Sequence, residues 1–215
     1  MSTRLVLVRH GESRATVDEI VGGHEGCKGL SDRGRRQAEA LRDRFAATGE
    51  VKADALVASV MPRAIETAEI LAPALGDLPV RQECDVCEQH PGEADGISWS
   101  EYEARYRPDG WRFDPYAPEA PGAESVAEFN ARVARALTQV AQEHRDQTVV
   151  VACHGGVVGA SMVAFLGLPY QGRLLHGYVQ NTSITEWVLE DEGPGHPPPW
   201  RLVRYNDSAH LAGVD

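Results

Sequence analysis

The sequence lacks an apolar run long enough to cross a membrane, and its opening residues MSTRLVLVRHGES hold too short an apolar stretch for a signal peptide. It also lacks a basic run: 21 Lys and Arg residues stand against 32 Asp and Glu, a formal net charge of −11. Nucleic acid and anionic membrane surfaces are therefore poor partners. We expect a cytoplasmic protein in which a local cluster of positive groups holds any anionic substrate against the overall charge.

Cysteine is scarce, and the four present are Cys27, Cys84, Cys87 and Cys153. Without an export signal, free thiols are expected rather than disulfides. The Cys84-Asp-Val-Cys87 spacing also permits a redox pair. A zinc site would need the distant cysteines or nearby histidines to converge on this pair, which the spacing alone does not show.

The remaining composition is that of an ordinary globular protein. Of the 215 residues, 42% are hydrophobic and 25% are charged, which fits neither a disordered nor a fibrous class. The length suits one domain, and no internal repeat or interdomain linker divides it. We therefore predict a single domain over residues 1–215.

Short apolar runs typical of buried strands alternate along the chain with segments of helical periodicity. This order predicts an α/β fold of three layers, α/β/α, with a mostly parallel central sheet. Two final strands are expected to join the sheet as an antiparallel pair across a Pro/Gly-rich loop. The expected strands are 5–8, 55–58, 148–152, 182–190 and 200–206, the loop is 191–199, and the expected helices are 31–45, 62–75, 124–145 and 156–166.

Residues 97–122 interrupt the alternation with an aromatic, proline-containing excursion. At most one short helix is expected in it, around residues 100–106. A long irregular excursion in a compact α/β domain is more often a lid or binding loop than a linker. We expect a lid or substrate loop here, with packing alone as the alternative. Its aromatic residues are Trp99, Tyr102, Tyr106, Trp111, Phe113 and Tyr116.

Two predicted strands end in a histidine followed by glycine. LVLVRHG delivers Arg9 and His10, and TVVVACHGG delivers His154. In open α/β sheets, ligands bind in the crevice outside the carboxyl ends of the strands, so neighbouring strands would bring both imidazoles into one crevice. The glycines are expected to allow sharp turns. A single histidine after a strand is usually structural, but two in equivalent positions indicate a functional site.

A third strand leads into a helix that begins near Arg63, where free backbone donors also favour an anion. With Arg9 and the two histidines, Arg63 completes a local positive cluster. Arginine forks match the oxygens of a phosphoryl group with paired hydrogen bonds. The cluster therefore predicts a site for a phosphorylated substrate.

Several motifs carry a family resemblance, in order and over almost the whole chain: Arg9-His10-Gly11-Glu12, LSDRGRRQA from 30, SVMPRAIETA from 59, EQHPGEADG from 88, PGAES from 121, ACHGG from 152, and YNDSAHL near the C-terminus. With them the chain resembles the histidine phosphatase superfamily, also called the phosphoglycerate mutase-like family. The resemblance implies that His10 attacks the substrate phosphorus and forms a phosphohistidine. It also implies that Arg9, Arg63 and His154 hold the non-bridging oxygens, and that Glu88 gives a proton to the leaving oxygen and then activates water.

No carboxylate cluster suited to magnesium accompanies these residues, and fixed cations replace the charge of a metal. We predict a reaction without a metal ion and without a cofactor. The expected partner is a small phosphorylated substrate, and the family resemblance also allows a homodimer.

Two departures from the family pattern concern the substrate. The position six residues after His10, usually asparagine, is Thr16, which can still donate to a phosphate oxygen. The loop that often reads Asp-x-Pro-Leu reads Cys27-Lys28-Gly29-Leu30. Arg14 and His24 lie close to the signature and, with Thr16 and Gly155, are the predicted substrate-binding residues.

A mutase begins with the same phosphohistidine, so it is the alternative to a phosphatase. The mutases of the family carry a tyrosine shortly after the acid, whereas Glu88 is followed by Gln-His-Pro-Gly. This favours hydrolysis. A third alternative is a binding module that has lost catalysis, but such modules typically lack the nucleophile or the acid, and both are present. The other histidines receive no catalytic role; they are His90, which is expected to be exposed, His144, His176, His196 and His210.

Overall fold

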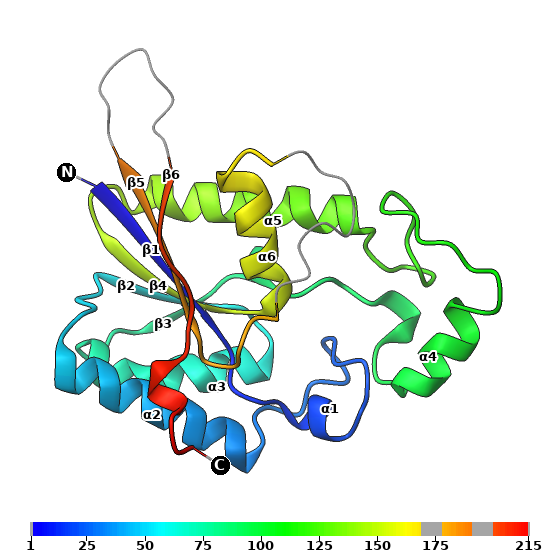
Figure 1. Ribbon diagram of the computed structural model, residues 1–215, viewed down its shortest axis with the longest axis horizontal. Coiled ribbons are helices and arrows are strands. Elements are labelled where there is room, and N and C mark those ends of the chain that lie inside the picture. The colour runs from blue at the N-terminus through cyan, green and yellow to red at the C-terminus, as the bar shows by residue number, and fades with distance from the viewer. Residues whose placement is uncertain (1, 169–177, 191–199, 215) are drawn as a thin grey trace.

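The computed structural model describes residues 2–168, 178–190 and 200–214. Its six strands form one sheet in the order β3-β2-β4-β1-β5-β6 (Figure 1). β3, β2, β4 and β1 pair in parallel, and β5 and β6 add to β1 as antiparallel strands. The predicted α/β class with a mostly parallel sheet is confirmed. The strands are β1 Ser2–Arg9, β2 Ala55–Ala58, β3 Val80–Gln82, β4 Thr148–Cys153, β5 Ile184–Glu190 and β6 Trp200–Asp207.

Helices cover both faces of the sheet and make the three predicted layers (Figure 1). Along β1 the side chains alternate: Leu5 and Leu7 pack in the core with α5 and α6, and Val6 and Val8 pack in the core with α2 and α3. The α-helices are α1 Arg14–Val17, α2 Asp32–Thr48, α3 Pro62–Leu71, α4 Trp99–Tyr106, α5 Val126–Glu143 and α6 Gly155–Phe165. Short 3-10 turns, η1 to η4, span Ala72–Leu75, Cys84–Val86, Gly92–Ala94 and Ala209–Leu211.

The helices begin where their sequences provide a cap. Ser31 caps α2 by accepting a hydrogen bond from the amide of Gly34, and Pro62 opens α3, where its missing N–H costs nothing. At α5, Ser125 and Glu128 form a reciprocal capping box. The apolar face of α5, including the fully buried Leu137, then lies on the sheet, and burial of such a side chain stabilises the fold by about 1.5–3 kcal/mol.

The sequence predicted the antiparallel pair at one edge of the sheet but not the short strand β3 at the other edge. The antiparallel pair of β5 and β6 is confirmed, and the predicted Pro/Gly-rich loop of 191–199 between them lies outside the described residues. β3 was not predicted, because its three residues are partly or fully exposed and carry no apolar pattern. No helix in the described parts of the chain combines the length and apolarity needed to span a bilayer.

The 97–122 excursion lies at one end of the molecule, beyond the layers of the sheet domain (Figure 1). Its predicted single short helix is α4, capped by Ser98. Glu119 ties the excursion together, because its carboxylate accepts hydrogen bonds from Tyr102 and Arg107, both at 2.6 Å. The guanidinium of Arg107 also lies over the rings of Tyr102 and Trp111, at 5.1 Å from each centroid.

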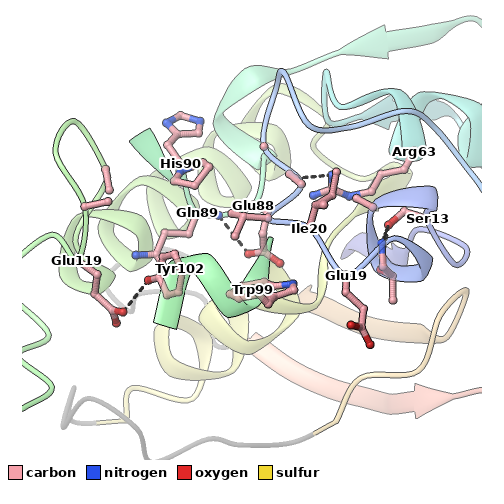
Figure 2. A pocket seen from close by; sticks show the side chains of 18 of the residues that line it. Ser13, Glu19, Ile20, Arg63, Glu88, Gln89, His90, Trp99, Tyr102 and Glu119 are labelled. Carbon is pink, nitrogen blue, oxygen red and sulfur yellow. Dashed lines mark hydrogen bonds between the residues drawn. The ribbon is translucent and has the colours of Figure 1, made fainter. Parts of the chain in front are cut away.

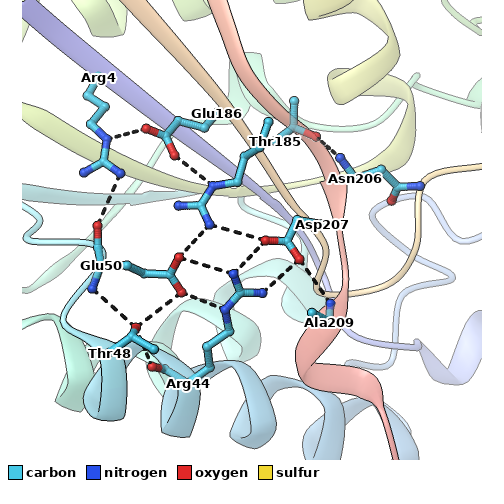
Figure 3. A network of polar contacts seen from close by, with 10 residues as sticks. Arg4, Arg44, Thr48, Glu50, Thr185, Glu186, Asn206, Asp207 and Ala209 are labelled. Atoms are coloured by element: carbon cyan, nitrogen blue, oxygen red, sulfur yellow. Dashed lines mark hydrogen bonds and ion pairs between the residues drawn. The ribbon is translucent and has the colours of Figure 1, made fainter.

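At the other end of the molecule, a polar network joins α2 to the antiparallel strands (Figure 3). Arg44 pairs with Glu50 at 2.7 Å and with Asp207 at 2.6 Å. Arg204 pairs with Glu50 at 2.6 Å and with Glu186 at 2.8 Å, and Glu186 also pairs with Arg4. Each guanidinium in this network therefore has at least one carboxylate partner.

Candidate active site

The adjacent strands β1 and β4 bring the two predicted histidines together. They run in parallel with Arg9 opposite Cys153, so His10 and His154 follow the same edge of the sheet. The centroids of the two imidazole rings are 5.1 Å apart, with an edge-to-face arrangement. Both side chains are buried. Because the rings meet edge to face, a ligand can touch both only from beside the pair, and their shared contact with one phosphate stays a prediction.

The hydrogen bonds of His10 leave Nε2 as the atom with a lone pair. Nδ1 lies 2.6 Å from the carbonyl oxygen of Gly11, which can only accept, so Nδ1 carries the hydrogen. Nε2 in turn accepts a hydrogen bond from Nε of Arg63 at 3.1 Å. The ring is held from its backbone as well, because the side-chain amide of Asn181 donates to the His10 carbonyl at 2.9 Å.

Both histidines are held in the neutral form. Burial lowers the pKa of His10 well below its usual value of 6.5, and the charges of Arg63 and Arg9 lower it further. Burial likewise lowers the pKa of His154, with the charge of Arg63 as the next contribution. A neutral imidazole keeps its lone pair available to an electrophile at physiological pH.

The two arginines provide the positive charge. Arg63, in the first turn of α3, is buried and donates to the carbonyl of Gly22 at 2.7 Å. Arg9 donates to the carbonyl of Val179. Among the residues that the structure describes, neither guanidinium forms an ion pair with a carboxylate, and the buried Nε of Arg9 has no hydrogen-bond partner. A bound anion would supply these missing partners.

His154 has one ring nitrogen bonded and one free. Its Nε2 lies 2.8 Å from Oγ of Ser59, whereas its buried Nδ1 has no partner. The Ser59 hydroxyl also lies 3.2 Å from the sulfur of Cys87, so its one hydrogen can go to either group; when it goes to Nε2, Nδ1 carries the hydrogen and can donate to a phosphate oxygen. Sequence reasoning missed Ser59 and Asn181. The signal for Ser59 was its place: it follows β2 at the same sheet edge, as the histidines follow β1 and β4.

Glu88 lies at the N-terminus of α6. One carboxylate oxygen accepts from the amide of Gly156 at 3.0 Å, and the other accepts from the amide of Gln89 at 3.2 Å. A Cβ at position 156 would lie 2.1 Å from that carboxylate, so only glycine allows this approach. The predicted acid is therefore brought to the strand edge that carries His154.

The glycine of the Arg-His-Gly signature is needed for space. Gly11 and Gly155 do not have positive φ, so the chain turns after His10 and His154 without a left-handed residue at these two positions. At Gly11 the requirement is space, because a Cβ there would lie 2.3 Å from the carbonyl oxygen of Gly34 in α2. The close approach of α2 and the signature loop fixes the backbone that carries His10.

A cavity of about 450 Å³ opens beside His10 (Figure 2), and the fully buried His154 is not part of its lining. Its lining combines catalytic candidates such as His10, Arg63 and Glu88 with Trp99 and Tyr102 of the excursion. This volume suits a small molecule. The excursion therefore forms a wall of the pocket, which is where a substrate loop was predicted to lie; its motion as a lid stays a prediction.

Of the predicted substrate-binding residues, Thr16 lines the cavity, whereas Arg14 and His24 lie outside its lining. Thr16 lines the cavity, with its hydroxyl 2.9 Å from that of Ser13. Arg14 is exposed and is absent from the lining. Gly155 begins α6 beside Arg9, and a Cβ there would lie 3.6 Å from Nε of that arginine. His24 is also outside the lining, and its ring faces His90 with 5.5 Å between the centroids.

His90 differs from its expected exposure, because its side chain is partly buried and lines the cavity. Within the described ranges, the group of side chains that could hold a metal ion is His24, Cys84, Cys87 and His90, beside the pocket and apart from His10. All four cysteines of the chain are free thiols, as predicted. His176 and His196 lie outside the described residues.

A sequence profile of the histidine phosphatase superfamily (branch 1) matches residues 5–208. The chain belongs to this superfamily. The family indicated by the motifs is thereby confirmed, and the matched range contains every histidine phosphatase motif on which the resemblance depended except the last residues of YNDSAHL.

Relatives in the histidine phosphatase superfamily include both reaction types. The metal-independent phosphoserine phosphatase of Arabidopsis thaliana is 30% identical over 216 residues, with 99% of this chain and 84% of the relative covered. A 2,3-bisphosphoglycerate-dependent phosphoglycerate mutase of Brucella anthropi is 32% identical over 175 residues, with 78% and 84% covered. The solved structure of a mycobacterial glucosyl-3-phosphoglycerate phosphatase is 27% identical with a TM-score of 0.78, covering 96% of this chain and 99% of that one.

Proposed function

We propose that the protein hydrolyses a small phosphomonoester through a phosphohistidine on Nε2 of His10. The observation that carries this proposal is the state of the His10 ring. Its Nδ1 hydrogen is committed to Gly11, its Nε2 lone pair faces Arg63 at 3.1 Å, and His154 lies across from it at 5.1 Å between centroids. This places a neutral nucleophile among donors that have no anion of their own to neutralise them.

The first step transfers the phosphoryl group to the enzyme. Nε2 of His10 forms a bond to phosphorus while the bond from phosphorus to the ester oxygen breaks. Nε of Arg63 must exchange its hydrogen bond to Nε2 for one to a phosphoryl oxygen. Arg9 and His154 then bind further oxygens through Nε and Nδ1, the buried atoms that have no partner. Donors placed at developing charge are worth roughly 3–4 kcal/mol each in measured cases.

Glu88 carries the proton in both steps. It donates a proton to the departing ester oxygen, and the alcohol leaves. It then accepts a proton from water as the water oxygen attacks phosphorus, the bond to Nε2 breaks, and inorganic phosphate is released. Its hydrogen bonds to the amides of Gly156 and Gln89 support this role by fixing the carboxylate.

No metal ion takes part in this chemistry, since Arg9 and Arg63 supply the positive charge that a metal would otherwise provide. We also propose that the enzyme is cytoplasmic. The substrate is small because the cavity is about 450 Å³, and its mixed lining of Trp99, Tyr102, Arg107 and Glu119 suits a leaving group with both polar and apolar parts.

The proposal can be tested by measuring the hydrolysis of a generic phosphomonoester. The protein is expected to release phosphate from p-nitrophenyl phosphate in the presence of EDTA, and a panel of small phosphorylated metabolites would then rank substrates by kcat/KM. Rapid interconversion of phosphoglycerates with no hydrolysis of simple esters would establish the mutase alternative instead. Binding of phosphate without turnover of any ester would establish the binding-module alternative.

A further inference from the structure

Four side chains with metal-binding atoms converge at the rim of the cavity. They come from two loops: His24 from the Gly-rich 21–29 loop, and Cys84, Cys87 and His90 from the segment around Glu88. One ligand atom of each, two thiol sulfurs and two imidazole nitrogens, lies within 4.8 Å of every other. The histidines that the Cys-x-x-Cys spacing needed are therefore supplied by the fold.

This set of atoms has the chemistry of a structural zinc site. Zn²⁺ is bound tetrahedrally by two cysteines and two histidines in many closed sites, with Zn–S bonds of about 2.3 Å and therefore edges between sulfurs of about 3.8 Å. Separations of up to 4.8 Å require only small side-chain movements to reach that geometry. A thiolate pair with imidazoles selects Zn²⁺ over magnesium or calcium, which bind oxygen.

Hydrogen bonds hold the backbone that carries Cys84 and Cys87. Cys84 opens the 3-10 turn Cys84–Val86, and the amide of Cys87 donates to the carbonyl of Cys84 at 3.0 Å. Arg132 of α5 holds this turn with hydrogen bonds of 2.7 Å to the carbonyl of Asp85 and 3.2 Å to that of Cys87. Both sulfurs are thereby presented from one fixed turn.

The loop that carries His24 is fixed independently. The carboxylate of Asp95 accepts hydrogen bonds from the amides of Gly23, Glu25 and Gly26 at 2.8 to 2.9 Å, which encloses position 24 on both sides. A Cβ at Gly23 or Gly26 would overlap that carboxylate, so the loop conformation depends on both glycines.

Burial across the cluster is graded in a way that suits a metal site. Cys87 is buried and the Nε2 atom of His90 is buried without a hydrogen-bond partner, whereas Cys84 and His24 are exposed. The inner side thus holds a buried imidazole nitrogen without a partner, and the outer side gives an ion a path from solvent.

We propose that His24, Cys84, Cys87 and His90 bind one Zn²⁺ ion in a closed tetrahedral site. All four positions are filled by protein atoms, so the ion has no open position for substrate or water and takes no part in the phosphoryl transfer. It joins the 21–29 loop to the backbone on both sides of Glu88. The inference does not depend on the proposed function, since it concerns binding and stability only.

The test uses the full chain, purified under reducing conditions, stripped with a chelator and titrated with zinc alone against a chromophoric competitor. We expect stoichiometric zinc in the wild type and an increase in Tm on loading. Binding is expected to weaken by about 100-fold or more in His24→Ala and Cys84→Ser, because loss of even an outer-shell partner costs roughly 10–100-fold. Loading with Co²⁺ should give the thiolate charge-transfer and visible bands of a tetrahedral site in the wild type.

His144→Ala, at the far end of α5, is the matched control and should bind zinc as the wild type does. The proposal is overturned if the wild type fails to compete for zinc. It is equally overturned if His24→Ala and Cys84→Ser retain wild-type affinity. None of these readouts measures turnover, so their failure leaves the proposed function untouched.

Discussion

Two clusters of charged side chains in this molecule are built in opposite ways. In the network of Arg4, Arg44, Glu50, Glu186, Arg204 and Asp207, guanidinium and carboxylate groups alternate (Figure 3). At the active site, the described residues around His10 and His154 provide two guanidinium groups without an ion pair and two imidazoles held neutral.

The difference shows how one chain separates stability from function. In the network, each charge is neutralised within the fold, so the cluster fixes α2 against β5 and β6. At the candidate active site the two guanidinium groups have no carboxylate partner, and in the proposed function a bound anion neutralises them, at a cost to the stability of the free protein. The overall charge of −11 makes this local reversal of sign necessary.

The largest effect is expected at the nucleophile. His10→Ala should reduce kcat by about 10⁴- to 10⁶-fold, because no other group can form the covalent intermediate. His144→Ala, the same substitution on the opposite end of the domain, should retain wild-type turnover of p-nitrophenyl phosphate. Comparable activity in the two variants would show that His10 is not the nucleophile.

Removal of one unpaired cation should have the next largest effect. Arg63→Ala is expected to reduce kcat by about 10²- to 10³-fold, the cost of one donor to developing charge. Arg201→Ala is the control, since Arg201 already pairs with Glu190 at 2.8 Å on the exposed strand β6. Lysine at position 63 should not restore activity, because it lacks the Nε that faces His10. A loss in Arg201→Ala equal to that in Arg63→Ala would place the anion site elsewhere.

A substitution in the polar network should lower the stability of the fold and leave turnover unchanged. Hydrogen bonds from Arg44 hold the pKa of Asp207 well below its usual range, so the charged form stabilises the fold above pH 3.8 and this contribution is lost as the pH falls through the lowered pKa. Asp207→Asn is expected to lower the free energy of unfolding by about 1–3 kcal/mol at pH 7. Denaturant titration measures stability and kinetics measures turnover. A fall in kcat with unchanged stability would contradict the assignment of Asp207 to the stability of the fold.

The smallest effect is expected in the pH profile. Only neutral His10 reacts, and its pKa is lowered by burial and by Arg63 and Arg9, so activity is retained below pH 6.5 and is lost only at the lowered pKa. The acid limb of kcat/KM, corrected for ionisation of the substrate, reports this pKa in the free enzyme. It should move upward in Arg9→Met, which removes one of the charges. A limb at 6.5 or above in the wild type would contradict the assignment.

Local patterns were enough to predict most of the fold and the centre of the site. The apolar runs of β1 and β4 and the periodicity of α5 are strong signals. The rule that ligands bind at the carboxyl ends of strands predicted that His10 and His154 lie in one crevice. β3 was missed because a strand of three exposed or half-exposed residues has no pattern to read.

What the sequence could not show depends on contacts between distant segments. Ser59 had only its place after a strand as a signal, and nothing local distinguishes Asn181 from a surface polar residue, since their roles come from His154 and from the backbone of His10. The same holds for the meeting of His24 with Cys84, Cys87 and His90, which depends on how Asp95 and Arg132 fix two separate loops.

The most direct test of the account is to trap the intermediate. The enzyme, mixed with an excess of radiolabelled phosphomonoester and quenched within milliseconds in denaturant at alkaline pH, is digested and mapped. We predict a label that is stable in alkali and labile in acid, located on Nε2 of His10 and absent from His10→Ala. Steady turnover without any labelled protein, or a label on a different residue, would contradict the central claim that this imidazole is the phosphoryl acceptor.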